Sequence, residues 1–325
     1  MSAGPSDQDG AALGRRLRER DLGAAPAACN LVENRAARRR ADIAALLGEV
    51  SPAALGGEAP AHVVGVTGPP GAGKSTLLSA LVGEWRERGR SVAVLAVDPT
   101  SKRSGGALLG DRARIEYDPA DRRVFIRSMA AGERYGGLAP ATRAAAQALA
   151  AAFDVVVIET VGVGQSETEV ADASDTVAVV VQPGSGDALQ FIKAGIMEIP
   201  DVLVVTKADL GQVAMRARRD LNAALRSLGA RSTPVIPVSS VHPRAGIGEL
   251  ADAIDEHRRG IDLAATRAAA RRLGALSDFV AERGEAGLRA LGGRRAAERL
   301  LAECDQRAPE PELVRALEER AAASA

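Results

Sequence analysis

Aromatic residues are scarce in this chain of 325 residues, making up only 2% of it. Proteins that bind single-stranded nucleic acid without a fixed sequence stack the bases on aromatic side chains, so the composition disfavours that class. Lysine plus arginine and aspartate plus glutamate each number 42, which leaves no net charge. Neither nucleic acid nor an anionic membrane surface is therefore an expected partner.

Cysteine and histidine are also rare. Cys29 and Cys304 stand near opposite ends of the chain, and the three histidines do not cluster with them. A disulfide framework or a zinc knuckle needs paired or clustered thiols, so we expect neither. No run of about 18 uninterrupted apolar residues occurs, and the first ten residues lack an apolar signal core, so the expected location is the cytoplasm.

One glycine-rich stretch carries the strongest signal. Residues 68–75 read Gly-Pro-Pro-Gly-Ala-Gly-Lys-Ser and lie between an apolar run and a helix-like segment. This matches the phosphate-binding pattern G-x-x-x-x-G-K-[ST], in which backbone N–H groups and a helix N-terminus surround the phosphates. Lys74 would contact the β- and γ-phosphates, and the Ser75 hydroxyl would ligate Mg²⁺. The predicted nucleotide-binding residues here are Gly68, Pro69, Pro70, Gly71, Ala72, Gly73, Lys74, Ser75 and Thr76.

Short β-branched runs alternate with helical or glycine-rich segments from residue 61 onward. Such near-continuous apolar strands are typical of a parallel sheet covered by helices on both faces. With the phosphate-binding pattern, they predict an α/β fold of the P-loop NTPase type, with its ligand beyond the carboxyl ends of the strands. The expected strands are 63–66, 91–97, 124–126, 155–158, 176–181, 202–205 and 235–238.

Helical patterns flank this region. We expect an N-terminal helical extension over 1–57, a P-loop GTPase domain over 58–261 and a C-terminal helical arm over 262–325. Arg35, Arg38, Arg39 and Arg40 form a basic face that is either solvated or a docking surface. The expected helices are 13–21 and 25–47 in the extension, and 267–282, 286–291, 294–305 and 312–322 in the arm.

Acidic residues follow two of the expected strands. Asp98 ends the run 91–97, and Glu159 begins the Walker B spacing of an acid, two spacers and Gly162. In P-loop NTPases such an acid orients Mg²⁺ or its water, while the glycine N–H meets the γ-phosphate. Asp111 could reach the γ-phosphate or the attacking water. For Asp98 and Asp111 a helix cap is the alternative.

The stretch Thr206-Lys207-Ala208-Asp209 resembles the base-reading motif N-K-x-D. The Asp209 carboxylate can accept hydrogen bonds from guanine N1–H and its amino group, a donor pair that adenine lacks, so a buried acceptor would reject ATP. Thr206 stands where asparagine is usual and has a shorter reach. Ser239, Ser240 and Val241 occupy the position of a loop that contributes a backbone N–H to the guanine carbonyl.

These motifs, together with five further stretches, resemble the MeaB/ArgK family of GTPases. The stretches are 30–34, 97–101, 109–112, 159–167 and 182–196. Members assist adenosylcobalamin-dependent methylmalonyl-CoA mutase and were once described as arginine/ornithine transport ATPases. The resemblance implies a GTP-hydrolysing chaperone that loads, gates and protects the cofactor of this or a related mutase, and that hydrolyses GTP slowly without its partner.

The resemblance also implies roles for individual residues. Lys74 and Ser75 would hold phosphate and metal, Asp98 and Glu159 would serve Mg²⁺, and Asp111 would belong to the first switch. Asp187 and Lys193 would carry the partner's signal, and the C-terminal arm would form a homodimer unless it packs on its own domain. The catalytic candidates are Lys74, Asp111, Glu159 and Gln165.

Two other functions were weighed against this one. A metallochaperone-type GTPase for another metalloenzyme would need a Cys/His delivery site, and two isolated cysteines and three histidines make one improbable. A transport-associated ATPase is disfavoured by Asp209 and by the absence of a membrane segment.

Overall fold

The computed structural model describes residues 9–34, 36–98, 115–130, 139–160, 170–184, 200–230 and 232–323. The chain divides into two compact units. One unit comprises residues 1–61, 140–153 and 262–325, and the other comprises residues 62–139 and 154–261. The three-part organisation expected from the sequence stays a prediction, because compactness does not test what each part does.

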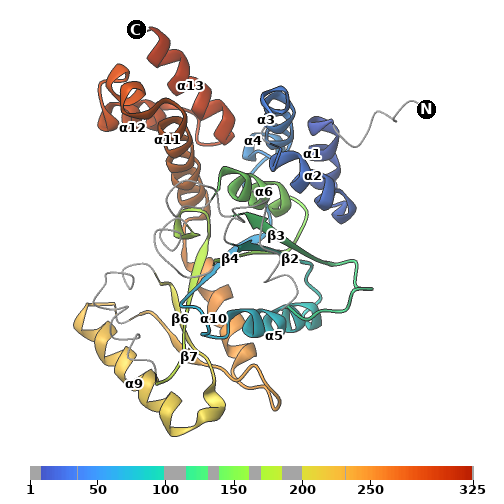
Figure 1. Cartoon of the computed structure of the whole chain (residues 1–325), viewed down its shortest axis with the longest axis vertical. Helices are drawn as coiled ribbons and strands as arrows, with labels where there is room; N and C mark the ends of the chain where they lie inside the picture. Colours follow the sequence, from blue (N-terminus) through green and yellow to red (C-terminus); the bar gives the residue numbers. More distant parts are fainter. Residues whose placement is uncertain are drawn as a thin grey trace, which may run out of the picture. The chain divides into compact units, whose positions relative to one another are not determined.

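The second unit is built on a seven-stranded sheet in the order β3-β2-β4-β1-β5-β6-β7 (Figure 1). Every neighbouring pair is parallel, and all seven expected strands are confirmed. The strand order reverses at β1, which makes its carboxyl end a place where ligands bind in such folds. The strands are β1 (His62–Thr67), β2 (Val92–Asp98), β3 (Val124–Ala130), β4 (Val155–Thr160), β5 (Thr176–Val181), β6 (Val202–Val205) and β7 (Val235–Pro237).

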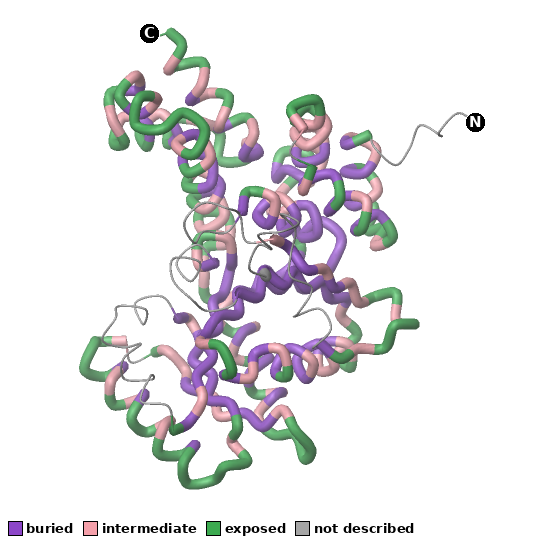
Figure 2. Tube along the Cα trace, viewed as in Figure 1, coloured by how far each residue is buried: buried purple, intermediate pink, exposed green. Residues whose placement is uncertain are grey.

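The central strands are buried along their whole length. Every residue of β1, β4, β5 and β6 is buried, and Figure 2 shows these strands in the colour of buried residues. Successive side chains of a strand point to opposite faces of the sheet, so both faces of this sheet need an apolar cover. Runs of valine satisfy that requirement, because a β-branched side chain packs well on a pleated surface.

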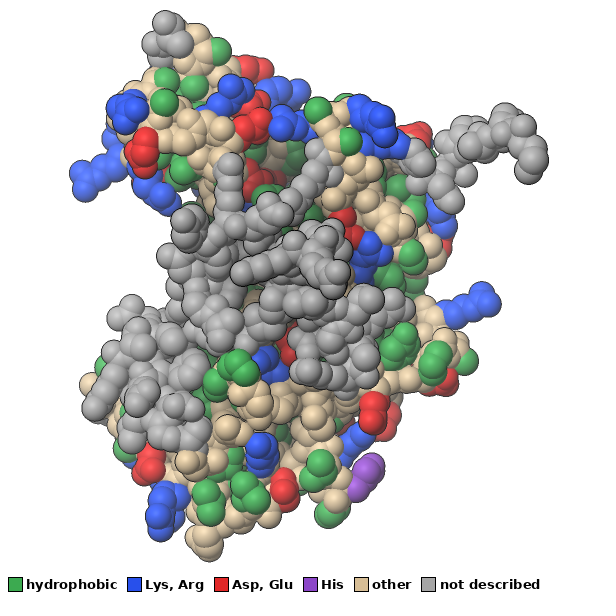
Figure 3. Space-filling view, in the orientation of Figure 1, with side chains coloured by type: hydrophobic (Ala, Val, Ile, Leu, Met, Phe, Trp, Pro, Cys, Tyr) green, Lys and Arg blue, Asp and Glu red, His purple; other side chains and the backbone are tan. Residues whose placement is uncertain are grey.

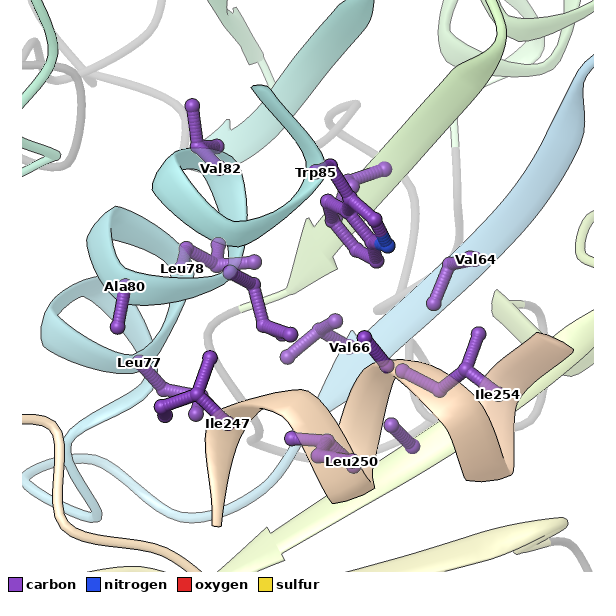
Figure 4. Packing of buried hydrophobic residues seen from close by; sticks show 14 of the residues in the cluster. Val64, Val66, Leu77, Leu78, Ala80, Val82, Trp85, Ile247, Leu250 and Ile254 are labelled. Atoms are coloured by element: carbon purple, nitrogen blue, oxygen red, sulfur yellow. The ribbon is translucent and has the colours of Figure 1, made fainter. Parts of the chain in front are cut away.

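Helices cover the two faces of the sheet. On one face, α5 (Lys74–Glu87) and α10 (Ile247–Gly260) pack with alternate residues of β1 and β5 in one apolar cluster. Figure 4 shows Leu77 of α5 and Ile247 of α10 lying beside one another. On the other face, α9 (Gln212–Ser227) packs with the remaining residues of β5 in a second cluster. The expected arrangement of helices on both faces is confirmed.

The first unit is helical in its described residues. The expectation of one helix over 25–47 is wrong, because the chain forms two helices separated by a turn and a short 3₁₀ helix (Ala37–Arg39). The side chain of Asn34 accepts a hydrogen bond from the Ala36 N–H at 3.1 Å, and Ala36 is extended. This local bond replaces helical bonding at that point. The helices of the unit are α1 (Gly10–Arg18), α2 (Ala25–Val32), α3 (Arg40–Glu49), α4 (Pro52–Leu55), α6 (Pro140–Ala150), α11 (Leu263–Ala290), α12 (Arg294–Glu303) and α13 (Glu310–Ala323).

The break expected between helices 267–282 and 286–291 lies within α11. Gly284 has φ 62° and ψ −163°, values outside the helical region. Apolar residues of α11 on both sides of this break form one cluster with α12 and α13, which includes Phe279, Leu301 and Leu317. The C-terminal helices thus have a core of their own.

A buried charged network joins α6, α11 and α13. The Arg143 guanidinium donates to the Asp278 carboxylate and, at 3.1 and 3.3 Å, to Glu310 Oε1. The Gln147 amide donates to Glu310 Oε2 at 3.0 Å. A Cβ on Gly274 would lie within 2.7–2.9 Å of the Glu310 carboxylate oxygens, so this position of α11 leaves room for the network.

Charges of both signs are mixed on the surface. In Figure 3 basic and acidic side chains intermingle over the face in view. The basic residues predicted to share one helix face are divided, since Arg38 and Arg39 belong to the 3₁₀ helix, Arg40 begins α3, and Arg35 lies outside the described residues. Arg39 pairs with Asp42 at 2.9 Å. Among the described helices, none is long and apolar enough to cross a membrane.

Candidate functional site

The phosphate-binding pattern forms the loop between β1 and α5. Gly68 follows the strand with φ 145°, and a Cβ there would lie 2.1 Å from the Val180 carbonyl oxygen of β5. Gly71 and Gly73 have φ 77° and 89°. Only glycine adopts such angles without strain, and only glycine fits so close to β5. The glycine spacing therefore follows from the path of the loop.

Lys74 is the first residue of α5. Its side chain is 7% exposed, and Nζ donates to the carbonyl oxygens of Gly68 at 2.7 Å and Pro69 at 3.3 Å. The ammonium group is thereby held against the loop. Unpaired N–H groups at a helix N-terminus attract anions, so this end of α5 combines two features that favour phosphate.

Ser75 and Glu159 meet at the carboxyl end of the sheet. The Ser75 hydroxyl donates to Glu159 Oε1 at 3.3 Å, and Glu159 is 2% exposed. Asp98 ends β2, which pairs with β4 up to the register Val97–Thr160; the side chain of Asp98 lies outside the described part of the structure. The backbone register thus brings the ends of the two acid-bearing strands side by side.

The oxygens of Ser75 and Glu159 fit Mg²⁺ chemistry, because Mg²⁺ prefers hard oxygen ligands and completes its shell with phosphate and water. Among the described residues, no group of three or more histidine, cysteine or acidic side chains could hold a metal by itself. A site shared with a nucleotide therefore fits this donor set better than a cage made only of protein.

The base-reading candidates follow β6 and β7. Asp209 lies in a short 3₁₀ helix (Ala208–Leu210) after β6 and is exposed. The Ser239 hydroxyl lies 3.4 Å from Asp209 Oδ1 and 3.1 Å from the Val241 carbonyl, and the Ala208 N–H donates to the Val238 carbonyl at 2.9 Å. The two base-reading segments are thus joined.

Asp209 is more exposed than the motif predicts. The expectation of a buried acceptor at this position is wrong, because Asp209 is exposed in the structure. A polar group in water loses little when a partner is missing, whereas an unsatisfied group buried by a ligand costs the full desolvation penalty. Selection against adenine at Asp209 would therefore require the bound base itself to cover the carboxylate.

Thr206 has a different set of partners from those expected. It is 3% exposed, and its hydroxyl lies 2.7 Å from the Ala72 carbonyl of the phosphate loop and 3.2 Å from the Val181 carbonyl of β5. The adjacent Lys207 has φ 54° and donates to Gln182 Oε1 at 2.6 Å. The side chains of Thr206 and Lys207 are thus both bonded to protein groups beside the predicted nucleotide-binding site.

Five predicted site residues lie outside the described part of the chain, and their roles stay predictions: Asp111, Gly162, Gln165, Asp187 and Lys193. Besides the contact of Thr206 with Ala72, two contacts among the described residues were missed from the sequence. Val180 limits Gly68 through a backbone carbonyl, and Gln182 binds Lys207. Their only signal would have been the pairing of β1 with β5 and of β5 with β6, which no local motif records.

Known proteins resemble the chain over most of its length. The family described as methylmalonyl Co-A mutase-associated GTPase MeaB matches residues 25–285. A probable GTPase of Mycobacterium bovis is 41% identical over 267 residues, covering 80% of this chain and 78% of the relative. A mitochondrial methylmalonic aciduria type A homologue of Caenorhabditis elegans is 39% identical over 203 residues, covering 59% of this chain and 50% of the relative.

Further similarity comes from an archaeal relative and from a solved structure. A protein of Pyrococcus abyssi, named as a candidate GTPase, is 49% identical over 210 residues; the match covers 62% of this chain and 64% of the relative, less than two thirds of its length. The crystal structure of an LAO/AO transport system kinase has a TM-score of 0.66 and 30% identity, covering 98% of this chain and 99% of that one. The family match extends over more than half of the sequence and includes the phosphate loop, Glu159 and Asp209. The chain belongs to the MeaB family of GTPases.

Proposed function

We propose that this protein binds and hydrolyses GTP and uses the nucleotide to control its action as a chaperone of an adenosylcobalamin-dependent mutase, methylmalonyl-CoA mutase or a relative. The observation that carries the GTPase part is that Lys74 bonds to the phosphate loop and the adjacent Ser75 bonds to Glu159, at the end of the sheet where the Asp209 segment also lies. The mutase part is supported by the family's description and by the name of the nematode relative.

The phosphate half of the site would act through charge. Lys74 and the loop N–H groups lie where negative charge concentrates during phosphoryl transfer, and preorganised donors of this kind stabilise a transition state without reorganising. Ser75 and Glu159, with Asp98 from the sequence, would hold Mg²⁺. The bound ion would neutralise part of the phosphate charge. In this proposal the chain's own residues bind and orient the triphosphate.

The guanine half of the site would act through Asp209. Its carboxylate would accept the N1–H and amino hydrogens of the base, and the hydroxyl of Ser239, 3.4 Å away, would keep it oriented. Ser240 and Val241 would border the guanine carbonyl. The segments that carry Asp111, Gly162 and Gln165 would position the attacking water. This role rests on the family resemblance alone.

Control by a partner would complete the cycle. Intrinsic hydrolysis is expected to be slow and to rise when the mutase binds, because a partner that prefers the hydrolysis-competent state shifts the population toward it. Asp187 and Lys193 would transmit that preference, and the C-terminal helices would support a homodimer. A coupling of about 1–3 kcal/mol corresponds to a roughly 5- to 150-fold change in rate.

The test is GTP turnover with and without an adenosylcobalamin-dependent methylmalonyl-CoA mutase. Wild-type protein should hydrolyse GTP in preference to ATP and accelerate when the mutase is added. Lys74→Ala should have strongly reduced turnover in both conditions, and Asp187→Ala and Lys193→Ala should keep basal turnover but lose acceleration. Absence of GTP turnover under all conditions would refute the GTPase assignment. Turnover that no mutase changes would refute the partner only.

A further inference from the structure

We propose that Thr206 positions the phosphate loop and does not read the base, an inference that rests on the proposed GTP function and sharpens it. The observation is the hydroxyl of Thr206, which is buried between the Ala72 carbonyl at 2.7 Å and the Val181 carbonyl at 3.2 Å. A residue inside the base-reading motif is thus directed to the loop that binds phosphate.

The Thr206 hydroxyl has too few hydrogen atoms to donate to both the phosphate loop and the base. A threonine hydroxyl has a single donor hydrogen, and both protein groups near it, the carbonyls of Ala72 and Val181, are acceptors. Guanine N7 and O6 are also acceptors. A hydroxyl committed to Ala72 therefore has no hydrogen left to donate to them. The donors of guanine, N1–H and the amino group, are taken by Asp209 in the proposed complex.

The geometry of the Ala72–Gly73 peptide group links Thr206 to a phosphate-binding N–H. The carbonyl of Ala72 and the N–H of Gly73 belong to the same planar trans peptide and point in opposite directions. Fixing the Ala72 oxygen toward Thr206 therefore fixes the Gly73 N–H away from it. Gly71 and Gly73, with φ 77° and 89°, leave this peptide few restraints of its own. Thr206 supplies the missing restraint and aims one loop N–H.

This role predicts an unusual pattern of ligand effects. Loss of the hydroxyl should weaken binding through the phosphate contacts, so the loss should not depend on the identity of the base. It should require the phosphates that the loop binds and should be small for a nucleoside monophosphate. A base-reading role predicts the reverse, because its loss would depend on the base and would be the same for mono- and diphosphates.

The experiment measures dissociation constants of GDP, 7-deaza-GDP and GMP by titration calorimetry. Thr206→Val keeps the shape and removes the hydroxyl, whereas Thr206→Ser keeps the hydroxyl and is the matched control. Thr206→Val should raise the Kd for GDP and 7-deaza-GDP equally, by about tenfold, and leave GMP within about threefold, as expected when only the phosphate contacts are lost. Thr206→Ser should stay close to wild type. Unchanged GMP binding also shows that the variant is folded.

Three results would overturn the inference. A loss for GDP that is absent for 7-deaza-GDP would mean that Thr206 reads N7. An equal loss for GDP and GMP would mean that its effect does not pass through the phosphate loop, and no loss at all would mean that it does not position the loop.

A second variant covers the case in which valine prevents folding. Thr206→Asn brings two donor hydrogens, so one can bind Ala72 while the other reaches N7, and GDP should bind more tightly while 7-deaza-GDP does not. An equal gain for both ligands would overturn the base argument. Failure of wild-type protein to bind GDP would refute the proposed function itself, which keeps the two outcomes apart.

Discussion

The stability of the C-terminal helices should fall as pH rises through neutrality, because of Glu310. Its carboxyl is buried at the start of α13 and shares the Arg143 guanidinium with Asp278. Burial raises the pKa of Glu310 from its usual 4.5 to about 7, and Arg143 opposes this only partly because it serves two carboxylates. Although burial alone would lower the pKa of Arg143, Glu310 and Asp278 raise it. Arg143 therefore stays charged throughout.

The direction of the effect follows from proton linkage. The folded state holds the Glu310 proton more tightly than the unfolded chain does, so folding is favoured while the carboxyl is protonated. This stabilisation is complete below pH 4.5 and is lost as the pH rises through about 7. Each unit of pKa shift corresponds to about 1.4 kcal/mol, so the change across this window is on the order of 3 kcal/mol.

Local hydrogen exchange is the appropriate assay, because the chain has two compact units and one unfolding midpoint would mix them. The amides of α13 should lose protection by roughly a hundredfold between pH 5 and 8, after correction for intrinsic exchange. Trp85, the single tryptophan, lies in α5 of the other unit. Its fluorescence should change little over the same range and provides an internal control.

Two variants complete the test. Glu310→Gln keeps an acceptor for Arg143 and cannot titrate, so it should abolish most of the pH dependence; the Gln147 amide can rotate to accept from the new side chain. Asp278→Asn leaves Arg143 to Glu310 alone and should move the loss of protection to lower pH. Protection that is constant with pH in wild type, or equally pH-dependent in Glu310→Gln, would refute the argument.

The nucleotide site gives three further predictions. Lys74→Ala should lower GTP turnover by roughly 10²–10³-fold, with the secondary structure unchanged by circular dichroism. Asp209→Asn should shift preference from guanine to xanthine nucleotides in titration calorimetry, and equal affinity of wild-type protein for ATP and GTP would contradict this role. Gly68→Ala should abolish nucleotide binding, because its Cβ would lie 2.1 Å from the Val180 carbonyl. Gly71→Ala also has a positive φ, 77°, but its Cβ would have no atom within 4 Å, so it should bind more weakly by only about tenfold.

The sheet could be predicted from the sequence because its signal is local. Each strand is a short run of β-branched residues, and burial on both faces makes the run continuous, as in 155–158 and 176–181. The prediction of one helix over 25–47 was wrong because the feature that interrupts it is not a repeated local pattern. Its composition is helical throughout, and in the described residues a short-range bond between Asn34 and the Ala36 N–H lies at the interruption. Helix prediction averages the preferences of many neighbouring residues, so a single side-chain bond of this kind has little weight in it.

The candidate site was predictable to the extent that its motifs are contiguous. Gly68 to Ser75 and Thr206 to Asp209 could be recognised as units, but the partner of Thr206 could not. That partner is the carbonyl of Ala72, and a backbone oxygen leaves no trace in residue type. The exposure of Asp209 was also hidden, since a motif gives the identity of an acceptor and not its solvent contact.

The end of β5 explains why these separate motifs act on one another. β5 pairs with β1 on one side and with β6 on the other, so it lies between the phosphate loop and the base-reading segment. Its Val180 carbonyl limits the position of Gly68. Its Val181 carbonyl accepts the N–H of Thr206 at 3.0 Å.

The next residue extends this arrangement, because Gln182 accepts from Lys207 at 2.6 Å. Three consecutive residues at the end of one strand therefore contact both halves of the candidate site. A displacement of this strand end in one direction would disturb the loop glycine and the base-reading motif together, since backbone carbonyls cannot move independently of their strand. The topology thus couples phosphate contacts to base contacts through β5, in addition to the direct contact of the Thr206 hydroxyl with the Ala72 carbonyl.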